Sequence, residues 1–305
     1  MPGGGQPRTN VSEGKPDDNS ATDKPLTTEQ EAMGLRVNTN IISMTAQRNL
    51  GSVTERLQGN YQRLSSGLRV ATAADDPAGL GISERMRSQI RSLGQASRNA
   101  QDGASLVQTA EGALAEVSSN LTRMRELAIQ SANGTLSVDD RAIIDIEFQA
   151  LVEEVDRIAT TTNFNGLALL DGSVTSLDLQ VGINAGETIG VTLEDVTAGT
   201  IGIDVLDVTD QANSNAALAV LDGAVNAVNE SRGALGAAQN RLASSIRSIA
   251  NARENLAAAE SRIRDVDVAS ETADLTRNSI MQQAAVSILG QANVQPQIAL
   301  QLLQQ

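Results

Sequence analysis

Several residue types are missing from this chain of 305 residues, and each absence excludes a class of chemistry. The chain has no Cys and no His, which excludes disulfides, thiolate metal sites, cysteine nucleophiles and imidazole bases. The common zinc sites and most serine- and cysteine-hydrolase mechanisms are excluded with them. We therefore expect no enzyme, no catalytic residue, no cofactor and no metal site.

Aromatic side chains are almost absent as well. There is no Trp, and the only aromatic residues are Tyr61, Phe148 and Phe164. Such a chain cannot fill a wide globular core with large rings. Its composition favours thin bundles in which helices approach closely through small residues.

Positive charge is scarce, and long apolar runs are missing. The formal net charge is −14, which argues against a nucleic-acid partner because phosphate binding needs a basic face. No run of 18 apolar residues exists that would predict a membrane span. The first residues, MPGGGQPRTN, lack the apolar stretch of a secretory signal peptide.

Residues 1–32 differ in composition from everything after them. They hold both lysines and four of the six prolines, and they are polar and aperiodic. This pattern predicts a disordered extension. Met33 opens the first apolar-periodic segment, so one hypothesis is that Met33 is the true start. Mass spectrometry of the native N-terminus tests it, and an intact peptide from residues 1–32 would refute it.

Two long stretches repeat apolar residues with a period of seven. In each stretch a small residue or a second apolar residue recurs three positions later. The first series is Met86, Leu93, Ala100, Val107, Leu114, Leu121 and Ala128. The second is Leu221, Val228, Leu235, Leu242, Ile249, Leu256 and Ile263. A strict heptad over this many turns predicts two long helices that pack against each other as a coiled coil.

Shorter elements are expected between these two helices. The segment ATAADDPAGLGIS at residues 71–83 predicts a connector, with Asp75 or Asp76 as a helix cap. Ser137 is expected to cap a helix that ends near Thr160. Alternating residues in LDLQVGI and ETIGVTL predict a β-hairpin, and a weaker strand pair is expected at residues 201–208. The fold class is therefore mainly α, a long coiled-coil bundle with a small β region at about 173–210.

The two ends of the periodic region share one property: they carry no charge. Residues 37–47 and 278–305 contain no Asp, Glu, Lys or Arg, although the last segment holds about ten large apolar side chains. Ordering this segment costs roughly 1.5 kcal/mol per residue, and a lone pair of helices buries only one face of each. We therefore expect the two ends to order on multi-copy assembly. The alternative is that they are ordinary core helices.

The apolar positions of these ends are the candidate polymerisation residues. They are Ile41, Met44, Leu50, Val53, Leu57, Ile280, Val286, Leu289, Ile298 and Leu302.

The sequence resembles a known family, bacterial flagellin, over nearly all of residues 33–305. The segments RVNTNIISMTAQRNL and LQGNYQRLSSGLRVATAADDPAGLGISERM resemble the flagellin N-terminal region. LTRMRELAIQSANGT, TTNFNGLALLDG and LQVGINAGETI resemble inner-domain motifs. ALGAAQNRLASSI and ESRIRDVDVASETADLTRNSIMQQAAVSILGQAN resemble the C-terminal region. These motifs are long, so a chance match is improbable.

The resemblance implies an architecture and a set of partners. A core helix within residues 33–75 would pair with one within residues 266–305, and residues 76–265 would form the bundle with its hairpin. The chain would polymerise with itself into the extracellular flagellar filament used for motility. The implied partners are a cap protein, hook-associated junction proteins, an export chaperone and the type III export apparatus.

Two features depart from many flagellins. The stretch from about Leu193 to Ala216 leaves no room for a large variable outer domain, so a short form is expected. The first 32 residues have no flagellin counterpart.

One further motif resembles a stretch that an innate immune receptor recognises in some flagellins. The matching positions are Arg123, Arg125, Glu126 and Leu127, with Glu147 on the next helix. The competing interpretation, which we favour as the primary role, is a face for packing between subunits.

Two other structural proteins remain as alternatives. A hook–filament junction protein shares this terminal architecture, and a secreted coiled-coil adhesin would also be helical. The density of filament-type motifs at both ends favours the filament subunit.

Overall fold

The computed structural model describes the backbone of residues 39–303 and the side-chain burial of residues 39–297. The expected disordered extension at residues 1–32, and Met33, lie outside the described residues. So do the side chains of Ile298 and Leu302. Among the described residues, no helix is both long enough and apolar enough to cross a membrane.

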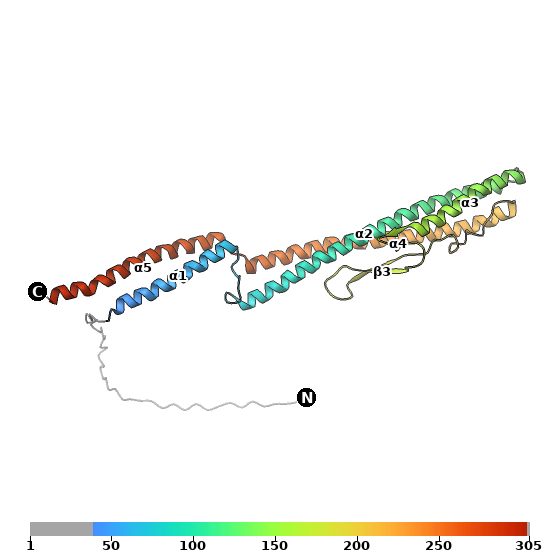
Figure 1. Cartoon of the computed structure of the whole chain (residues 1–305). Helices are drawn as coiled ribbons and strands as arrows, with labels where there is room; N and C mark the ends of the chain where they lie inside the picture. The colour runs from blue at the N-terminus through green and yellow to red at the C-terminus, as the bar shows by residue number, and fades with distance from the viewer. Residues whose placement is uncertain (1–38, 304–305) are drawn as a thin grey trace, which may run out of the picture. The chain divides into compact units, whose positions relative to one another are not determined.

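Five helices make up most of the described chain (Figure 1). They are α1 (Ile41–Ser66), α2 (Pro77–Ser131), α3 (Val138–Thr161), α4 (Gln211–Arg264) and α5 (Val268–Leu303). Four short strands lie between α3 and α4: β1 (Asn163–Phe164), β2 (Leu167–Ala168), β3 (Ser176–Gln180) and β4 (Thr188–Thr192). The expected class, mainly α with a small β-hairpin region, is confirmed.

The helix starts follow from local sequence chemistry. Asp76 caps α2 by accepting hydrogen bonds from the backbone N–H groups of Ala78 and Gly79, and Pro77 occupies the first helical turn. The connector is therefore shorter than residues 71–83, because this capped proline starts the helix at once. Ser137 and Asp140 form a capping box at the start of α3, as expected for Ser137.

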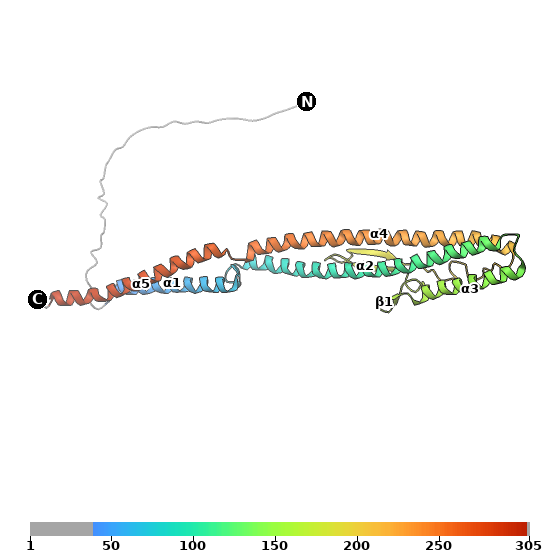
Figure 2. The same cartoon turned by 90° about the horizontal axis from the view of Figure 1, so that it is seen from above.

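The two heptad series form the seam between α2 and α4, which run side by side in both views (Figure 2). Ion pairs Glu84–Arg264 and Arg125–Asp222 show that the two helices are antiparallel. From Leu93 to Ala128 the predicted positions of α2 are buried, and so are those of α4 from Leu221 to Leu242. The series is only half-buried at Leu256 and Ile263.

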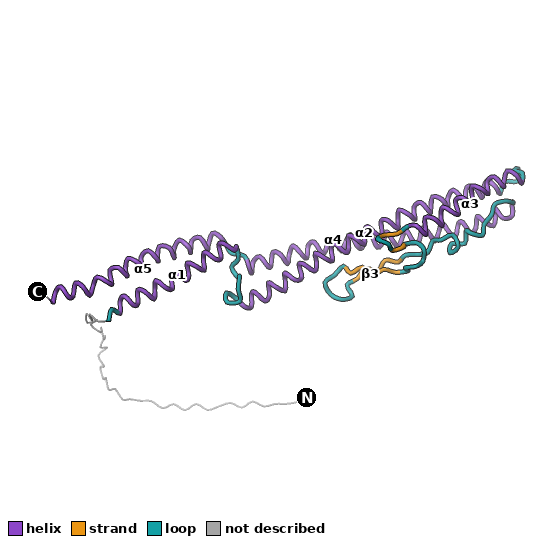
Figure 3. The backbone as a smooth tube through the Cα atoms, in the orientation of Figure 1, coloured by secondary structure: helices purple, strands orange, loops and turns teal. Residues whose placement is uncertain are grey.

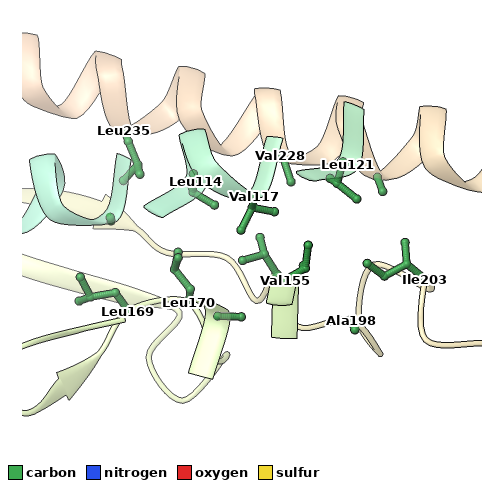
Figure 4. Close-up of a cluster of buried hydrophobic side chains, with 14 of the residues drawn as sticks. Leu114, Val117, Leu121, Val155, Leu169, Leu170, Ala198, Ile203, Val228 and Leu235 are labelled. Atoms are coloured by element: carbon green, nitrogen blue, oxygen red, sulfur yellow. The ribbon is translucent and has the colours of Figure 1, made fainter. Parts of the chain in front are cut away.

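A third layer covers one side of this seam. Phe148 and Val155 of α3 are fully buried, and the loop residues Leu169, Leu170 and Ile203 are buried with them. Figure 4 shows side chains from α2, α3, α4 and these loops converging on one cluster. The main core therefore lies where α3 and the β region cover the α2–α4 pair.

The expected hairpin is present as β3 and β4, an antiparallel pair in which Leu177 lies opposite Val191 (Figure 3). Gly186 in its turn has a φ of +85°, a conformation that favours glycine. Gly103 of α2 lets the hairpin pack closely, because a Cβ there would overlap the side chain of Leu179.

The weaker strand pair expected at residues 201–208 is wrong, because this segment is a series of turns. Its apolar residues Ile203 and Val208 are buried as anchors of a loop instead. A second hairpin, β1 with β2, was not expected. Its turn consists of Asn165 and Gly166, both with positive φ, the arrangement that tight two-residue hairpins require.

The chain divides into two compact units. The described part of the first unit comprises residues 39–54 and 280–303, and the second comprises residues 55–279. The division falls inside α1 and α5, so each of these helices contributes residues to both units.

Candidate functional site

In the first unit, the start of α1 contacts the last part of α5 through polar groups. The Asn40 side-chain amide donates a hydrogen bond of 2.7 Å to the Ala292 carbonyl, and the Ser43 hydroxyl donates one of 2.8 Å to Asn293 Oδ1. Ala46 and Val53 are buried close to this contact in the sequence. The pair therefore has a narrow seam of small and polar residues.

Of the eight candidate polymerisation residues whose side-chain burial is described, four are largely exposed and do not face this seam. Ile41 and Met44 are 52% and 56% exposed, and Ile280 and Val286 are 62% and 54% exposed. Leu50 and Leu289 are half-buried, whereas Val53 and, in the second unit, Leu57 are buried. The structure thus separates the predicted set into residues that hold the pair together and residues that remain uncovered.

Further uncovered apolar residues were not in that set. They are Ile42, Ile288 and Val294, of which Ile288 is 57% exposed. The sequence signal that could have indicated them is the lack of charge in residues 37–47 and 278–305. This property applies to every position in the two segments, whereas the predicted set followed one helical face. The apolar residues of α5 show no preference for one face of the helix.

In the second unit, α1 and α5 are joined by a buried polar cluster. Asn278 donates a hydrogen bond of 2.7 Å to Asn60 Oδ1, and Asn60 donates one of 2.5 Å to Glu271 Oε1. All three residues are buried, and an Arg63 guanidinium nitrogen lies 3.9 Å from the same carboxylate oxygen. Sequence reasoning missed this cluster, because nothing in the heptad pattern shows which polar residues face each other.

The connectors between these helices and the bundle also pair with each other. The backbone N–H of Arg69 donates to the Arg264 carbonyl at 2.7 Å, and that of Val266 donates to the Gly67 carbonyl at 3.0 Å. Gly67 has a φ of +71°, which ends α1 and turns the chain. These backbone hydrogen bonds hold the two connectors side by side.

The candidate receptor residues lie on α2 and α3. Both Nε and Nη2 of Arg123 donate to Glu147 Oε1, at 2.9 and 2.8 Å, and Nη1 donates to Glu126. Hydrogen bonds to Glu147 and Glu126 raise the pKa of Arg123 further above its ordinary range. Arg125 instead donates to Asp222 of α4, and Leu127 is buried. The structure therefore brings Arg123, Glu126 and Glu147 together on the surface and places Leu127 in the core.

Comparison with known families matches two long stretches of the chain. Residues 37–175 match the profile described as the bacterial flagellin N-terminal helical region, and residues 218–303 match the C-terminal helical region. The chain belongs to the bacterial flagellin family. Flagellins are structural proteins, and this chain is a structural subunit of the bacterial flagellar filament.

Relatives over the whole family region agree with this assignment. The chain is 52% identical over 269 residues to a flagellin of Halalkalibacterium halodurans, a match that covers 88% of this chain and 99% of the relative. It is 43% identical to a flagellar filament core protein of Treponema maltophilum, with 88% of this chain and 99% of the relative covered. The short region between the two matched profiles fits a flagellin without a large variable domain.

A solved structure described as a flagellar hook-associated protein of Vibrio parahaemolyticus shares the fold. The TM-score is 0.54 at 16% identity, and the match covers 63% of this chain and all of that chain. At this identity the likeness concerns the fold alone.

Proposed function

We propose that the uncovered apolar side chains of α1 and α5 are the polymerisation surface of this flagellin. The helical pair within residues 33–75 and 266–305 acts as the assembly module, and residues 76–265 act as a bundle domain. The proposal assigns the assembly contacts to the predicted set together with Ile42, Ile288 and Val294.

The observation that supports it is the distribution of apolar residues on α5. When the apolar residues of a helix are not confined to one face, a single partner helix leaves some of them uncovered. One partner helix, α1, covers only one side, and Ile280, Val286 and Ile288 all remain more than half exposed. Each large apolar side chain contributes about 1.5–3 kcal/mol when fully buried. Further copies of the chain supply the missing cover.

A truncation tests the proposal most directly. The chain that ends after Arg277 lacks the uncharged part of α5 and keeps most of the second unit. Purified full-length protein is expected to elongate filament seeds, whereas the truncated protein is expected to stay monomeric by light scattering and electron microscopy. Elongation by the truncated chain would refute the proposal.

A point variant refines this test. Ile288→Glu places a charge on the uncovered face of α5, and burial of an unpaired charge is costly. Asn226→Glu, at an exposed position of α4, adds the same charge outside the assembly module. We expect Ile288→Glu to abolish elongation and Asn226→Glu to retain it.

The remaining assignments follow from family membership. We place the polymer outside the cell, and we assign a cap protein, hook-associated junction proteins, an export chaperone and the type III export apparatus as partners. Pull-down of the chaperone and of the cap by the full chain tests the two partners that bind the subunit directly. Absence of binding by both would remove them from the list.

We assign the face formed by Arg123, Glu126 and Glu147 first to packing between subunits and second to an innate immune receptor. The exposure of these side chains supports the assignment. Arg123 and Glu147 remain about half exposed although they form an ion pair. Exposed ion pairs contribute little to stability, so this geometry is available to a partner.

The alternatives weighed from the sequence, a hook–filament junction protein and a secreted coiled-coil adhesin, can be tested on the filament itself. A junction protein occupies a short zone, whereas a filament subunit dominates by mass. Electron microscopy and mass spectrometry of sheared filaments distinguish the two. A trace amount of this chain would support the junction protein, and a chain absent from filaments would support the coiled-coil adhesin.

A further inference from the structure

Charge is separated along the α2–α4 bundle. Residues 77–101 and 241–264, defined here as the basic segment, hold nine arginines and three glutamates, a net charge of +6. Residues 102–240, the acidic segment, hold 21 acidic residues and five arginines, a net charge of −16. Because α2 and α4 are antiparallel, with Glu84 paired to Arg264, the two parts of the basic segment lie beside each other.

Most of the positive charge in the basic segment is uncompensated by neighbours. Seven of its arginines are exposed and form no ion pair with any residue of the described part of the chain. They are Arg85, Arg91, Arg98, Arg241, Arg247, Arg253 and Arg262.

The same segment contains an apolar notch of about 300 Å³. Leu93 of α2, Ile249 and Ala252 of α4, and Val181 and Ile183 of the β3–β4 hairpin are among the residues that line it. Arg253 directly follows the lining residue Ala252, and Arg241 precedes the lining residue Ser245 by four positions, a spacing that places it on the same face of α4. One carboxylate, Glu187, also lines the notch, and its oxygens accept hydrogen bonds from Asn184.

The acidic segment presents a loop with complementary properties. Val205 is 78% exposed, the highest value among the large hydrophobic side chains for which burial is described. Asp204 precedes it and Asp207 follows two residues later. The loop is firmly anchored, because Ile203 and Val208 are buried and Gln149 Nε2 donates to the Leu206 carbonyl at 2.8 Å. An apolar tip flanked by carboxylates is therefore held outward.

We propose that the notch of the basic segment binds the Asp204–Asp207 loop of a second copy of this chain. The aliphatic tip fills the apolar notch, and the flanking carboxylates face the unpaired arginines. Two copies aligned in register would instead place acidic segment against acidic segment. Among copies that run in the same direction, complementary charges therefore select a displaced, head-to-tail arrangement, because the acidic and basic segments meet only when such copies are shifted along the bundle. Such a contact does not close on itself and extends into a filament.

This inference rests on the proposed polymerisation and adds a second contact that directs it. Reciprocal charge reversal tests it. Variant A carries Arg241→Glu and Arg253→Glu, and variant B carries Asp204→Arg, which keeps the apolar tip Val205. These side chains are exposed and make no ion pair within residues 39–303, so both variants should retain the fold by circular dichroism and thermal unfolding.

Seed elongation is then followed at low ionic strength for each variant and for their mixture. We expect each variant alone to elongate at least about tenfold more slowly than the unmodified chain. An equimolar mixture is expected to elongate, because every contact between an A subunit and a B subunit again pairs opposite charges. Added NaCl should restore variant A in part, because it screens the new repulsion.

Each outcome decides the matter. If both variants elongate at the unmodified rate, or if the mixture fails as the single variants do, the charge-complementary contact is wrong while polymerisation through α1 and α5 stands. If the unmodified chain does not elongate seeds, the polymerisation proposal is wrong, and the inference is wrong as well because it rests on that proposal. Recovery in the mixture alone supports the inference.

Discussion

Asn60 of α1 donates a buried hydrogen bond of 2.5 Å to the carboxylate of Glu271 on α5, across 211 residues of sequence. Asn278 extends this hydrogen-bond network, because its side-chain amide donates to Oδ1 of the same Asn60. A buried polar residue in a helical seam specifies register, because a shifted alignment leaves its groups without partners. We infer that this cluster fixes how α1 and α5 align in the second unit.

The first prediction concerns that alignment. Asn60→Ala removes the donor to Glu271 and the acceptor for Asn278, which leaves buried polar groups unsatisfied. We expect the free energy of unfolding of the second unit to fall by about 1–3 kcal/mol. Denaturant unfolding followed by circular dichroism measures it, with Gln62→Ala, an exposed position of α1, as the matched control. Equal unfolding midpoints for the two variants would contradict the prediction.

A second prediction concerns the start of α4. Asp210 caps this helix by accepting hydrogen bonds of 2.8 Å from the N–H groups of both Ala212 and Asn213. Asp210→Ala should lower stability by about 0.5–2 kcal/mol. Asp204→Ala removes a carboxylate from the same loop without removing a cap, and it should leave the thermal midpoint close to that of the unmodified chain. A similar loss in both variants would show that the cap contributes nothing specific.

A third prediction concerns acid. Hydrogen bonds from Asn213 and Thr209 hold the pKa of Asp207 below its ordinary value of 3.8. A carboxyl group whose pKa is lowered on folding contributes stability above its ordinary pKa, and this contribution is lost as the pH falls through the lowered value. The pKa values of Asp140 and Asp195 are lowered in the same direction. The unmodified chain should therefore lose stability below about pH 4.

Asp207→Asn isolates the contribution of one group. The amide oxygen still accepts hydrogen bonds but cannot take up a proton in this range. The variant should be less stable than the unmodified chain at neutral pH, and the difference should shrink on acidification. Thermal midpoints measured from pH 7 downward test this, and a constant difference at all pH values would exclude the linkage.

A fourth prediction concerns the surface of α2 and α3. Arg123→Ala removes the donor to Glu147 without changing the core, so the monomer should keep its thermal stability. If this face binds an innate immune receptor, monomers should activate reporter cells and the variant should lose that activity. The control is Arg157→Ala, because Arg157 is also an exposed arginine and forms an ion pair with Glu154 within α3. No activation by the unmodified monomer would eliminate the receptor role and leave subunit packing.

The sequence by itself determined the long helices, the caps at Asp76 and Ser137, and the β3–β4 hairpin. These features arise from repeats of seven and two residues and from short capping motifs, so neighbouring residues carry all the information. Leu121 and Val228, for example, are fully buried at positions that the heptad series names. The uncharged ends likewise indicated assembly from composition alone.

Only the tertiary structure decided what the remaining residues do. Residues 201–208 look like strands in sequence, yet Ile203 and Val208 are buried as loop anchors and Val205 is exposed. The Asn60–Glu271 pair and the notch between Leu93 and Ile249 depend on segments far apart in the chain. Periodicity specifies which face of a helix is buried, but it cannot specify which distant residue covers that face, because that depends on how the whole chain packs.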